Sequence, residues 1–442
     1  MKKTYLKVLG AAVIGVLACA GCTKQNSGGA GSSSQASSGG ASSSGKTEIR
    51  FAYWGGDNRH KITAEAIALF EKANPDIKVN TEISGGAGDH FMKVDTQLAG
   101  GGAPDLIQMG GNIPDYAVNK AVLLELDKYK GSLLNTDVID PTVLAEGQGA
   151  WNGKLYGICL GTNMLVLAYN KGLLERSGAA LPGNAMTWAE MRSWAAEVAP
   201  KLPAGVFPMV DNSLNQSNYF SYFLSQQGTV LWDGKATQAT LDSIQKWIDM
   251  WEDYRAAKLI PDAESVASYA ETGPDNTSMF VAGKAVLALI WSNQFSAYQQ
   301  AMQDDLDLIQ LPDLNKNAIW VQPSQYLTVY KNSQNPDAAV KFIDFFVNNP
   351  EAAKVLGNDR GFTSSEIARE AIKQIATPVE QKVYAYYDVA VPHASPFTGN
   401  FPNDQEFNNT YKLILQRVAF KQVPSQQGAQ QILDMTQRLL KK

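Results

Sequence analysis

Aromatic rings beside amides are the residues of this sequence best suited to a specific chemistry. Trp54 lies in the stretch YWGGDNRH and Trp291 in IWSNQF, and LGTNM places an amide near a glycine. A tryptophan ring can stack on the apolar face of a pyranose, while Asp, Asn, Gln and Arg side chains bridge neighbouring hydroxyls. With nine Trp and seventeen Tyr, the chain has the residue types that a sugar-binding site needs.

Patterns for catalysis and metal binding are missing from the sequence. There is no G-x-S-x-G, no H-E-x-x-H and no G-x-x-x-x-G-K-[ST], and no C-x-x-C follows residue 46. The three histidines, His60, His90 and His393, lack the spacing of a metal site. We therefore expect no catalytic residue, no metal and no cofactor, although the many carboxylates leave a glycosidase pair open.

Most of the aromatic residues are expected in the core. Four tryptophans lie at helical spacing, which predicts burial on one face of a helix. These four are Trp188, Trp194, Trp247 and Trp251. Trp54 and Trp291 are instead flanked by glycine, asparagine and charged residues, so a binding site and the core are equally open for them.

The elements that must position these residues alternate along the chain. Apolar periodicity predicts strands at 46–54, 76–83 and 103–109 and helices at 60–75 and 90–102. This alternation predicts an α/β fold with a largely parallel sheet. Ligands of such sheets bind beyond the carboxyl ends of the strands, and YWGGDNRH follows the first strand.

The same rhythm continues to the end of the chain. Strands are expected within 154–170 and helices at 187–199 and 425–440, with two helices in 337–357 that are separated at Pro350. After residue 46, roughly 395 residues remain, which is too many for one simple core and suggests two lobes. The net charge is −5 and no basic stripe occurs, so nucleic acid is not an expected partner.

The N-terminus resembles a bacterial lipoprotein signal. Three lysines within the first seven residues precede an apolar stretch at 8–20, which is too short for a transmembrane helix. We expect residues 1–21 to be removed and Cys22 to carry a diacylglyceryl group, with Cys19 as the alternative. Residues 22–46 then form a Gly/Ser-rich tether that cannot fold and spans roughly 25 to 30 Å. Cys159 is the one other thiol.

Several stretches in order resemble the extracellular solute-binding proteins of ATP-binding-cassette importers, in the carbohydrate group similar to maltose-binding protein. They include IRFAYWGG, TQLAGGGAPDLIQM, LAYNKGLLERSG and NPDAAVKFIDFFVNNPEAAKVLGNDRGF. The resemblance implies a class II, two-lobed periplasmic-binding-protein-like fold, each lobe a mostly parallel sheet flanked by helices, with a hinge. The N-terminal lobe would take 47–158 and 328–375, and the C-terminal lobe 159–327 and 376–442.

The resemblance also implies a function. A monomeric receptor, lipid-anchored outside the membrane of a single-membrane bacterium, would trap a sugar, in our interpretation an oligosaccharide, and deliver it unchanged to membrane permease subunits. The ligand contacts implied by position are Trp54, Asp57, Arg59, His60, Gln108, Asn112, Asn163, Tyr219, Trp291, Asn293, Gln294, Arg360 and Phe401, with Phe397 as an alternative to Phe401.

Some questions about the ligand stay open at this point. Asn163 stands where maltodextrin binders carry an acidic residue, which argues against maltose, while Arg59, His60 and Arg360 make a uronate worth testing. Arg59 and Asp57 could instead form an ordinary surface ion pair. No stacking ring is expected from the glycine-rich stretch SGGAGDHF. Alternative functions are a surface-anchored carbohydrate-active enzyme and a receptor for a non-sugar solute, such as a polyamine or a phosphate ester.

Overall fold

The computed structural model describes residues 45–214, 217–270, 277–313, 319–395, 397, 399, 401 and 403–441. The expected signal and the first 23 residues of the expected tether, with both candidate lipidation cysteines, lie outside this part of the chain. Within it, no helix is long and apolar enough to cross a membrane.

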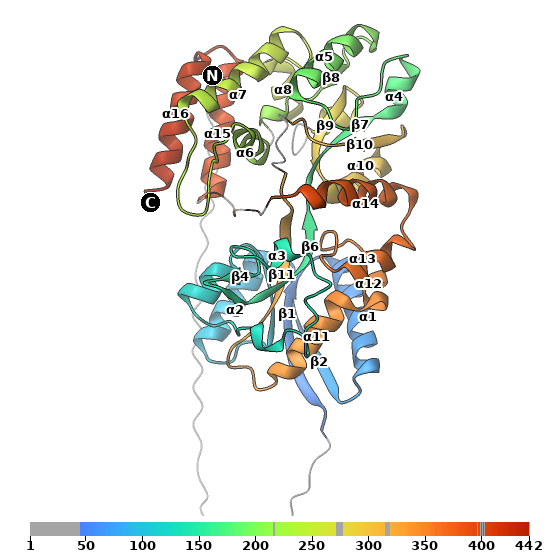
Figure 1. Ribbon diagram of the computed structural model, residues 1–442, viewed down its shortest axis with the longest axis vertical. Coiled ribbons are helices and arrows are strands. Elements are labelled where there is room, and N and C mark those ends of the chain that lie inside the picture. The colour runs from blue at the N-terminus through green and yellow to red at the C-terminus, as the bar shows by residue number, and fades with distance from the viewer. Residues whose placement is uncertain are drawn as a thin grey trace, which may run out of the picture. The chain divides into compact units, whose positions relative to one another are not determined.

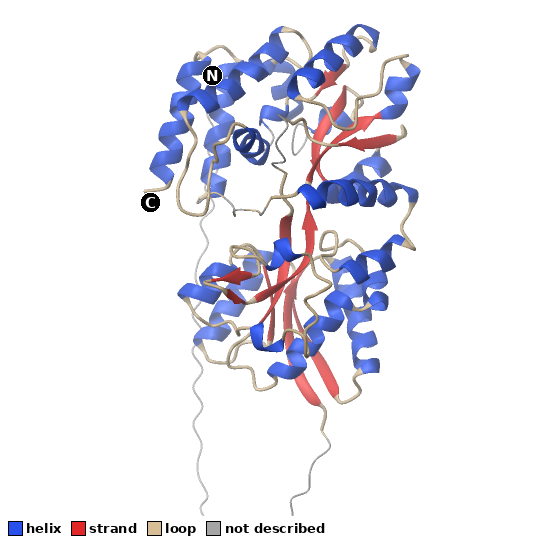
Figure 2. Cartoon of the chain, viewed as in Figure 1, coloured by secondary structure: helices blue, strands red, loops and turns tan. Residues whose placement is uncertain are grey.

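Two mixed β-sheets organise residues 45–442 (Figure 2). The first sheet has five strands in the order β2-β1-β3-β11-β6. Its strands are β1 (Thr47–Trp54), β2 (Ile77–Ser84), β3 (Leu106–Met109), β6 (Gly157–Asn163) and β11 (Gln322–Val329). Strand β1 pairs in parallel with β2 and β3, and β11 runs antiparallel to both β3 and β6.

Helices whose apolar side chains recur at the helical period cover the first sheet. In α1 (Asp57–Ala73), the buried residues include Ala66, Ile67 and Phe70, so one face of the helix packs on the core. The Phe70 ring lies 5.1 Å from that of Phe342, on α11. The other helices of this group are α2 (Ala87–Ala99), α11 (Pro336–Asn348), α12 (Pro350–Leu356) and α13 (Glu366–Lys373).

The helix break expected at Pro350 is confirmed. Asn349 caps α12 by accepting hydrogen bonds from the backbone N–H groups of Glu351 and Ala352. Proline is favoured at the first helical position because its missing N–H would have no partner there.

The second sheet has four strands in the order β10-β7-β9-β8. Its strands are β7 (Leu165–Asn170), β8 (Phe207–Met209), β9 (Ala285–Trp291) and β10 (Leu306–Ile309). Strand β9 pairs in parallel with β8 and antiparallel with β7, which is also antiparallel to β10. A small hairpin of β4 (Ala150–Trp151) and β5 (Lys154–Leu155) stands apart from both sheets.

An aromatic core lies beside the second sheet. On α5 (Trp188–Val198) and α7 (Leu241–Ala256), the four tryptophans expected at buried positions are all buried, which confirms that prediction. A capping box of Thr187 and Glu190 begins α5. The remaining helices are α3 (Pro141–Leu144), α4 (Lys171–Arg176), α6 (Ser217–Gln226), α8 (Ala263–Ala270), α9 (Thr277–Val281), α10 (Phe295–Ala301), α14 (Pro378–Ala390), α15 (Asp404–Ala419) and α16 (Ser425–Leu439).

The expected α/β class with helix-flanked sheets is confirmed, but the sheets are not mostly parallel. Strand β6 leaves the first sheet and the chain enters β7 of the second after a single residue, Met164. Strand β11 brings the chain back and therefore runs against β6 and β3. Parallel neighbours need a crossover connection, whereas antiparallel neighbours do not. A strand that returns from the other sheet can therefore pair in the antiparallel direction, and the sheet becomes mixed.

Strand β6 makes close contacts where it passes from one sheet toward the other. A Cβ on Gly161 would lie 2.5 Å from the carbonyl O of Arg360, so this position needs glycine. The hydroxyls of Tyr386 and Tyr387, on α14, donate to the carbonyls of Leu165 and Thr162, and Figure 1 shows α14 beside this passage. The expected lobe boundaries at 158/159 and 327/328 fall inside β6 and β11, and these boundaries stay a prediction.

Candidate ligand-binding site

The carboxyl end of β1 presents a supported tryptophan ring. Trp54 is the last residue of β1 and is partly exposed. Its ring centroid lies 5.0 Å from that of His90 and 5.5 Å from that of Phe91, both on α2. Rings held in such contacts keep a defined orientation, so the Trp54 ring is fixed while the residue keeps part of its surface exposed.

The rings that support Trp54 come from the stretch in which no stacking ring was expected. His90 and Phe91 follow the glycines of SGGAGDHF, and α2 begins after Gly86. The Phe91 ring also lies 6.0 Å from that of Tyr116. The stretch nevertheless supplies two rings, because the start of α2 places His90 and Phe91 against Trp54.

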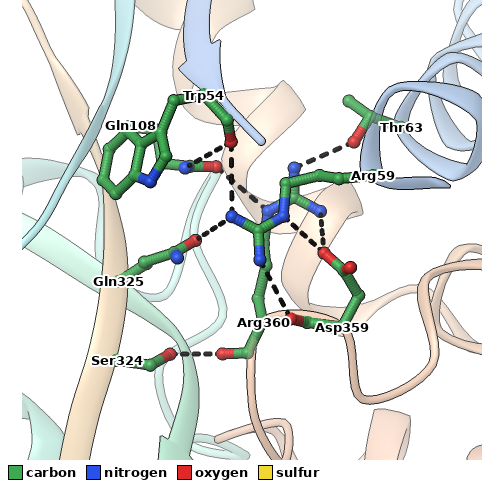
Figure 3. A network of polar contacts seen from close by, with 8 residues as sticks. All are labelled: Trp54, Arg59, Thr63, Gln108, Ser324, Gln325, Asp359 and Arg360. Atoms are coloured by element: carbon green, nitrogen blue, oxygen red, sulfur yellow. Dashed lines mark hydrogen bonds and ion pairs between the residues drawn. The ribbon is translucent and has the colours of Figure 1, made fainter. Parts of the chain in front are cut away.

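A polar network lies behind Trp54 (Figure 3). Arg59, in the first turn of α1, donates through Nε to Asp359 Oδ2 at 2.5 Å and through Nη2 to the Asp359 carbonyl at 3.0 Å. Its Nη1 donates to the carbonyl of Trp54 at 3.3 Å and to Gln325 Oε1 at 3.4 Å. The surface pair of Arg59 with Asp57 that the sequence left open is not formed: Arg59 pairs with a residue 300 positions away.

Arg360 is the buried member of this network. Its side chain is 5% exposed, and it donates through Nε to Gln108 Oε1 at 3.0 Å and through Nη2 to Thr63 Oγ1 at 2.8 Å. Burial, helped by the neighbouring Arg59 charge and opposed by Asp359, lowers the pKa of Arg360 to about 9. At neutral pH the group is still protonated, so the protein interior holds a positive charge here.

Four residues expected to contact the ligand lie in the interior. Gln108 and Arg360 are bonded to each other within the network, and Tyr219 and Phe401 belong to the aromatic core. The Tyr219 ring is 0% exposed and packs 5.3 Å from that of Trp188. Packing against other segments buries all four side chains in this structure, and their assignment as ligand contacts stays a prediction.

The other expected residues of the first sheet lie at or near the surface. Asp57 is exposed at the start of α1, and His60 is partly buried with its ring edge against Tyr53. Asn112 is partly buried, and its Oδ1 accepts a hydrogen bond from the backbone N–H of Gly110 at 3.2 Å. These residues follow β1 and β3, which are parallel neighbours, so they share the edge at which Trp54 lies.

The passage between the sheets brings a second group of expected residues together. Asn163 ends β6 and Trp291 ends β9, and the backbone N–H of Ser292 donates to the carbonyl of Met164 at 2.9 Å. Gln294 Oε1 accepts from the backbone N–H of Trp291, and the neighbouring Asn293 is exposed.

Two amide oxygens in this second group have no hydrogen-bond partner among the described residues. Asn163 Oδ1 and Gln322 Oε1 are both buried and unpartnered, and the two residues are register partners in β6 and β11. Buried acceptors are normally satisfied, so a hydroxyl donor from outside the chain would complete them. Sequence reasoning missed Gln322, because its register partner is 159 residues away.

Trp320 was also missed. Its ring is partly exposed and lies 6.2 Å from that of Phe397 in a stacked arrangement. Phe397, the alternative to Phe401, is likewise partly exposed, and its carbonyl accepts a hydrogen bond from Gln148 Nε2. Trp320 lies in the amide-rich stretch NKNAIWVQPSQ, so the same pattern that selected Trp54 and Trp291 could have found it.

Comparison with known proteins supplies the family. A sequence profile described as bacterial extracellular solute-binding protein matches residues 65–379, well over half of the chain. The chain belongs to this family. The resemblance read from the sequence is therefore confirmed, and an extracellular solute-binding protein acts outside the cytoplasm.

Individual relatives of this solute-binding protein cover most of its length. The arabinooligosaccharide-binding protein of Bacillus subtilis is 23% identical over 385 residues, which are 82% of this chain and 80% of that protein. A family 1 extracellular solute-binding protein from Alicyclobacillus acidocaldarius has a TM-score of 0.81, with 26% identity over 90% of this chain and 99% of that one. A periplasmic oligogalacturonide binding protein from Yersinia enterocolitica has a TM-score of 0.74, with 22% identity over 89% and 99% of the two chains.

The Arg59–Asp359 pair is predicted to stabilise this solute-binding protein. Asp359→Asn leaves two guanidinium groups without their shared carboxylate, and we expect a loss of about 1 to 3 kcal/mol in the free energy of unfolding. Arg59→Met should cost less, because Asp359 then still lies 3.6 Å from Arg360 Nη1. Urea unfolding followed by circular dichroism measures both.

An exposed pair of similar geometry provides the control. Arg192 Nε also lies 2.5 Å from its partner, Asp253 Oδ2, but these side chains are 43% and 49% exposed, against 14% and 20% for Arg59 and Asp359. Asp253→Asn should change stability by about 1 kcal/mol or less. Equal losses for Asp359→Asn and Asp253→Asn would contradict the role given to the buried pair.

His90 is predicted to make stability depend on pH. Burial lowers its pKa, an effect opposed by the contact of Nε2 with the Gln108 carbonyl at 2.9 Å. As the pH falls through about 6.5, the unfolded chain binds a proton at His90 before the folded chain does, so stability decreases. Between pH 7 and 5, the wild type should lose more stability than His90→Gln, whereas the exposed His393→Gln should follow the wild type. Parallel curves for all three proteins would refute this.

Proposed function

We propose that this solute-binding protein is an oligosaccharide receptor of an ATP-binding-cassette importer. The observation that carries the proposal is the Trp54 ring, fixed by His90 and Phe91 at the carboxyl end of β1 and still partly exposed. A partly exposed indole with amides and carboxylates around it suits the alternating apolar and hydroxyl surfaces of a sugar. The arabinooligosaccharide-binding relative supports the same class of ligand.

The amide groups near the passage between the sheets support a ligand rich in hydroxyls. The unpartnered oxygens of Asn163 and Gln322 are acceptors, and Asn293 adds an exposed amide. Hydroxyls of a saccharide can donate to such acceptors. A receptor site of this kind binds with affinities on the order of micromolar, about −8 kcal/mol, which a few stacks and hydrogen bonds supply.

We further propose that the oligosaccharide is neutral. A uronate was worth testing because Arg59 and Arg360 were expected at the site, but every N–H-bearing nitrogen of Arg59 has a partner in the chain and Arg360 is buried. To bind a carboxylate of the ligand, the guanidinium of Arg59 or Arg360 would have to break its hydrogen bonds within the chain. The likeness to an oligogalacturonide binding protein concerns the fold alone. An acidic ligand needs a free guanidinium, and Arg59 and Arg360 are both bonded within the chain.

In this proposal the protein leaves its ligand unchanged and hands it to permease subunits in the membrane. It acts as a monomer on the outer face of the cell membrane, through a lipid on Cys22, with Cys19 as the alternative position. The tether at 22–46 would let the folded part move above the membrane surface. None of these steps requires a cofactor.

Calorimetric titration tests the ligand class. Neutral arabinan-derived oligosaccharides should bind without release of products and with little dependence on salt, whereas digalacturonate should not bind. Trp54→Ala should weaken binding by roughly five- to thirtyfold, since a stacked ring contributes roughly 1 to 2 kcal/mol. Trp151→Ala, which removes a partly buried tryptophan of the β4–β5 hairpin, is the matched control. Binding of digalacturonate alone, or equal affinities for both variants, would overturn the assignment.

Expression in a bacterial host tests the anchor. The wild-type protein should label with a radioactive fatty acid and sediment with membranes, and Cys22→Ser should release it in unlabelled form. Cys19→Ser should remain membrane-bound. If the two variants exchange behaviour, Cys19 is the lipidated residue, and if neither affects fractionation the lipid anchor is wrong.

A further inference from the structure

The network behind Trp54 contains more positive than negative charge. Asp359 Oδ2 lies 2.5 Å from Arg59 Nε and 3.6 Å from Arg360 Nη1, so one carboxylate serves two guanidinium groups. Their other partners, such as Gln108, Thr63 and the Trp54 carbonyl, are neutral. A buried cation without a full counter-charge is costly, which makes a further anion favourable at this place.

One atom of Arg360 lacks a partner. Nε and Nη2 donate to Gln108 and Thr63, whereas Nη1 is buried and has no hydrogen-bond partner among the described residues. A buried unpartnered donor in a folded protein commonly marks a bound water or ion. Rotation of the guanidinium toward another acceptor is restricted, because its central carbon is packed 5.4 Å from the centre of the Phe346 ring and 5.9 Å from that of the Tyr53 ring.

Arg360 also lines a small cavity. It has a volume of about 20 Å³, and its lining includes Thr363 and Gly357 together with apolar side chains, among them Phe346 and Leu356. Such a volume is sufficient for one water-sized particle, either a water molecule or a monatomic anion. Thr363 Oγ1 accepts from the backbone N–H of Ser365 at 3.3 Å, so its own hydrogen is available to an occupant.

We propose that this cavity is a binding site for a single monatomic anion, chloride, held by Arg360 Nη1 and the hydroxyl of Thr363. An anion supplies the missing charge, which a water molecule does not. The site is separate from sugar binding and does not depend on that assignment.

The chloride would hold the loop that carries Asp359. This loop follows α12 and pairs with β6 through Phe362 and Thr162, whose backbone groups exchange hydrogen bonds of 2.7 and 2.9 Å. Because Asp359 in turn orients Arg59, and Arg59 binds the Trp54 carbonyl, the anion stabilises the segment behind the ligand-facing ring.

Thermal unfolding in sodium chloride and in sodium methanesulfonate at equal ionic strength tests the site. The wild type should show a saturable rise in Tm with chloride or bromide, on the order of 2 °C, and none with the larger anion. Arg360→Met and Thr363→Val should lose or weaken the difference. Arg192→Met, which removes an exposed arginine elsewhere, should keep it and so controls for the loss of one charge.

Crystals of the wild-type protein grown in sodium bromide give a second measurement that does not depend on a folded variant. An anomalous peak in contact with Arg360 Nη1 supports the proposal. Density for a water without anomalous signal, together with the same Tm in both salts, overturns it.

Discussion

The ion pair between Arg59 and Asp359 is the contact on which the binding face depends. It joins the first turn of α1 to a loop 300 residues later in the chain. The remaining N–H groups of Arg59 reach the carbonyl that ends β1 and the side chain of Gln325 in β11. One guanidinium therefore connects three segments: the end of strand β1, strand β11, and the loop that carries Asp359. Arginine suits this position because its planar fork can bond several acceptors at once.

This use of arginine also decides what the site can recognise. A guanidinium that is bonded to its own chain has no free geometry for a carboxylate on a ligand, so the same residue types that suggest an acidic sugar in the sequence become structural in the fold. What remains partly exposed near this network includes the Trp54 residue and the amide of Asn112. Specificity is a difference between affinities, and under the proposed function the difference against acidic ligands would arise from charges that are already engaged. An anion beside Arg360 would engage the last of them.

The aromatic residues differ in role between the two sheets. In the core beside the second sheet, rings such as Trp247 and Tyr219 are fully buried and contact one another at 5.5 Å, which stabilises the fold without presenting a surface. At the first sheet, His90 and Phe91 are placed so that Trp54 is held but not covered. The difference lies in the neighbouring helices: α7 lies on its core with an entire apolar face, whereas α2 meets the strand end near its own first turn.

The sequence by itself determined the local elements and the family. Periodicity predicted α1, α5 and the break at Pro350, because a helix or strand shows its buried face at intervals of a few residues. Tertiary structure decided which of the expected residues remain accessible. Arg59 pairs with Asp359 instead of Asp57, and Tyr219 and Phe401 are buried in a core. Gln322 lies beside Asn163. It also decided the mixed direction of the strands. Partners separated by 150 to 300 residues leave no periodic trace along the chain, since their contact arises only when the sheets form.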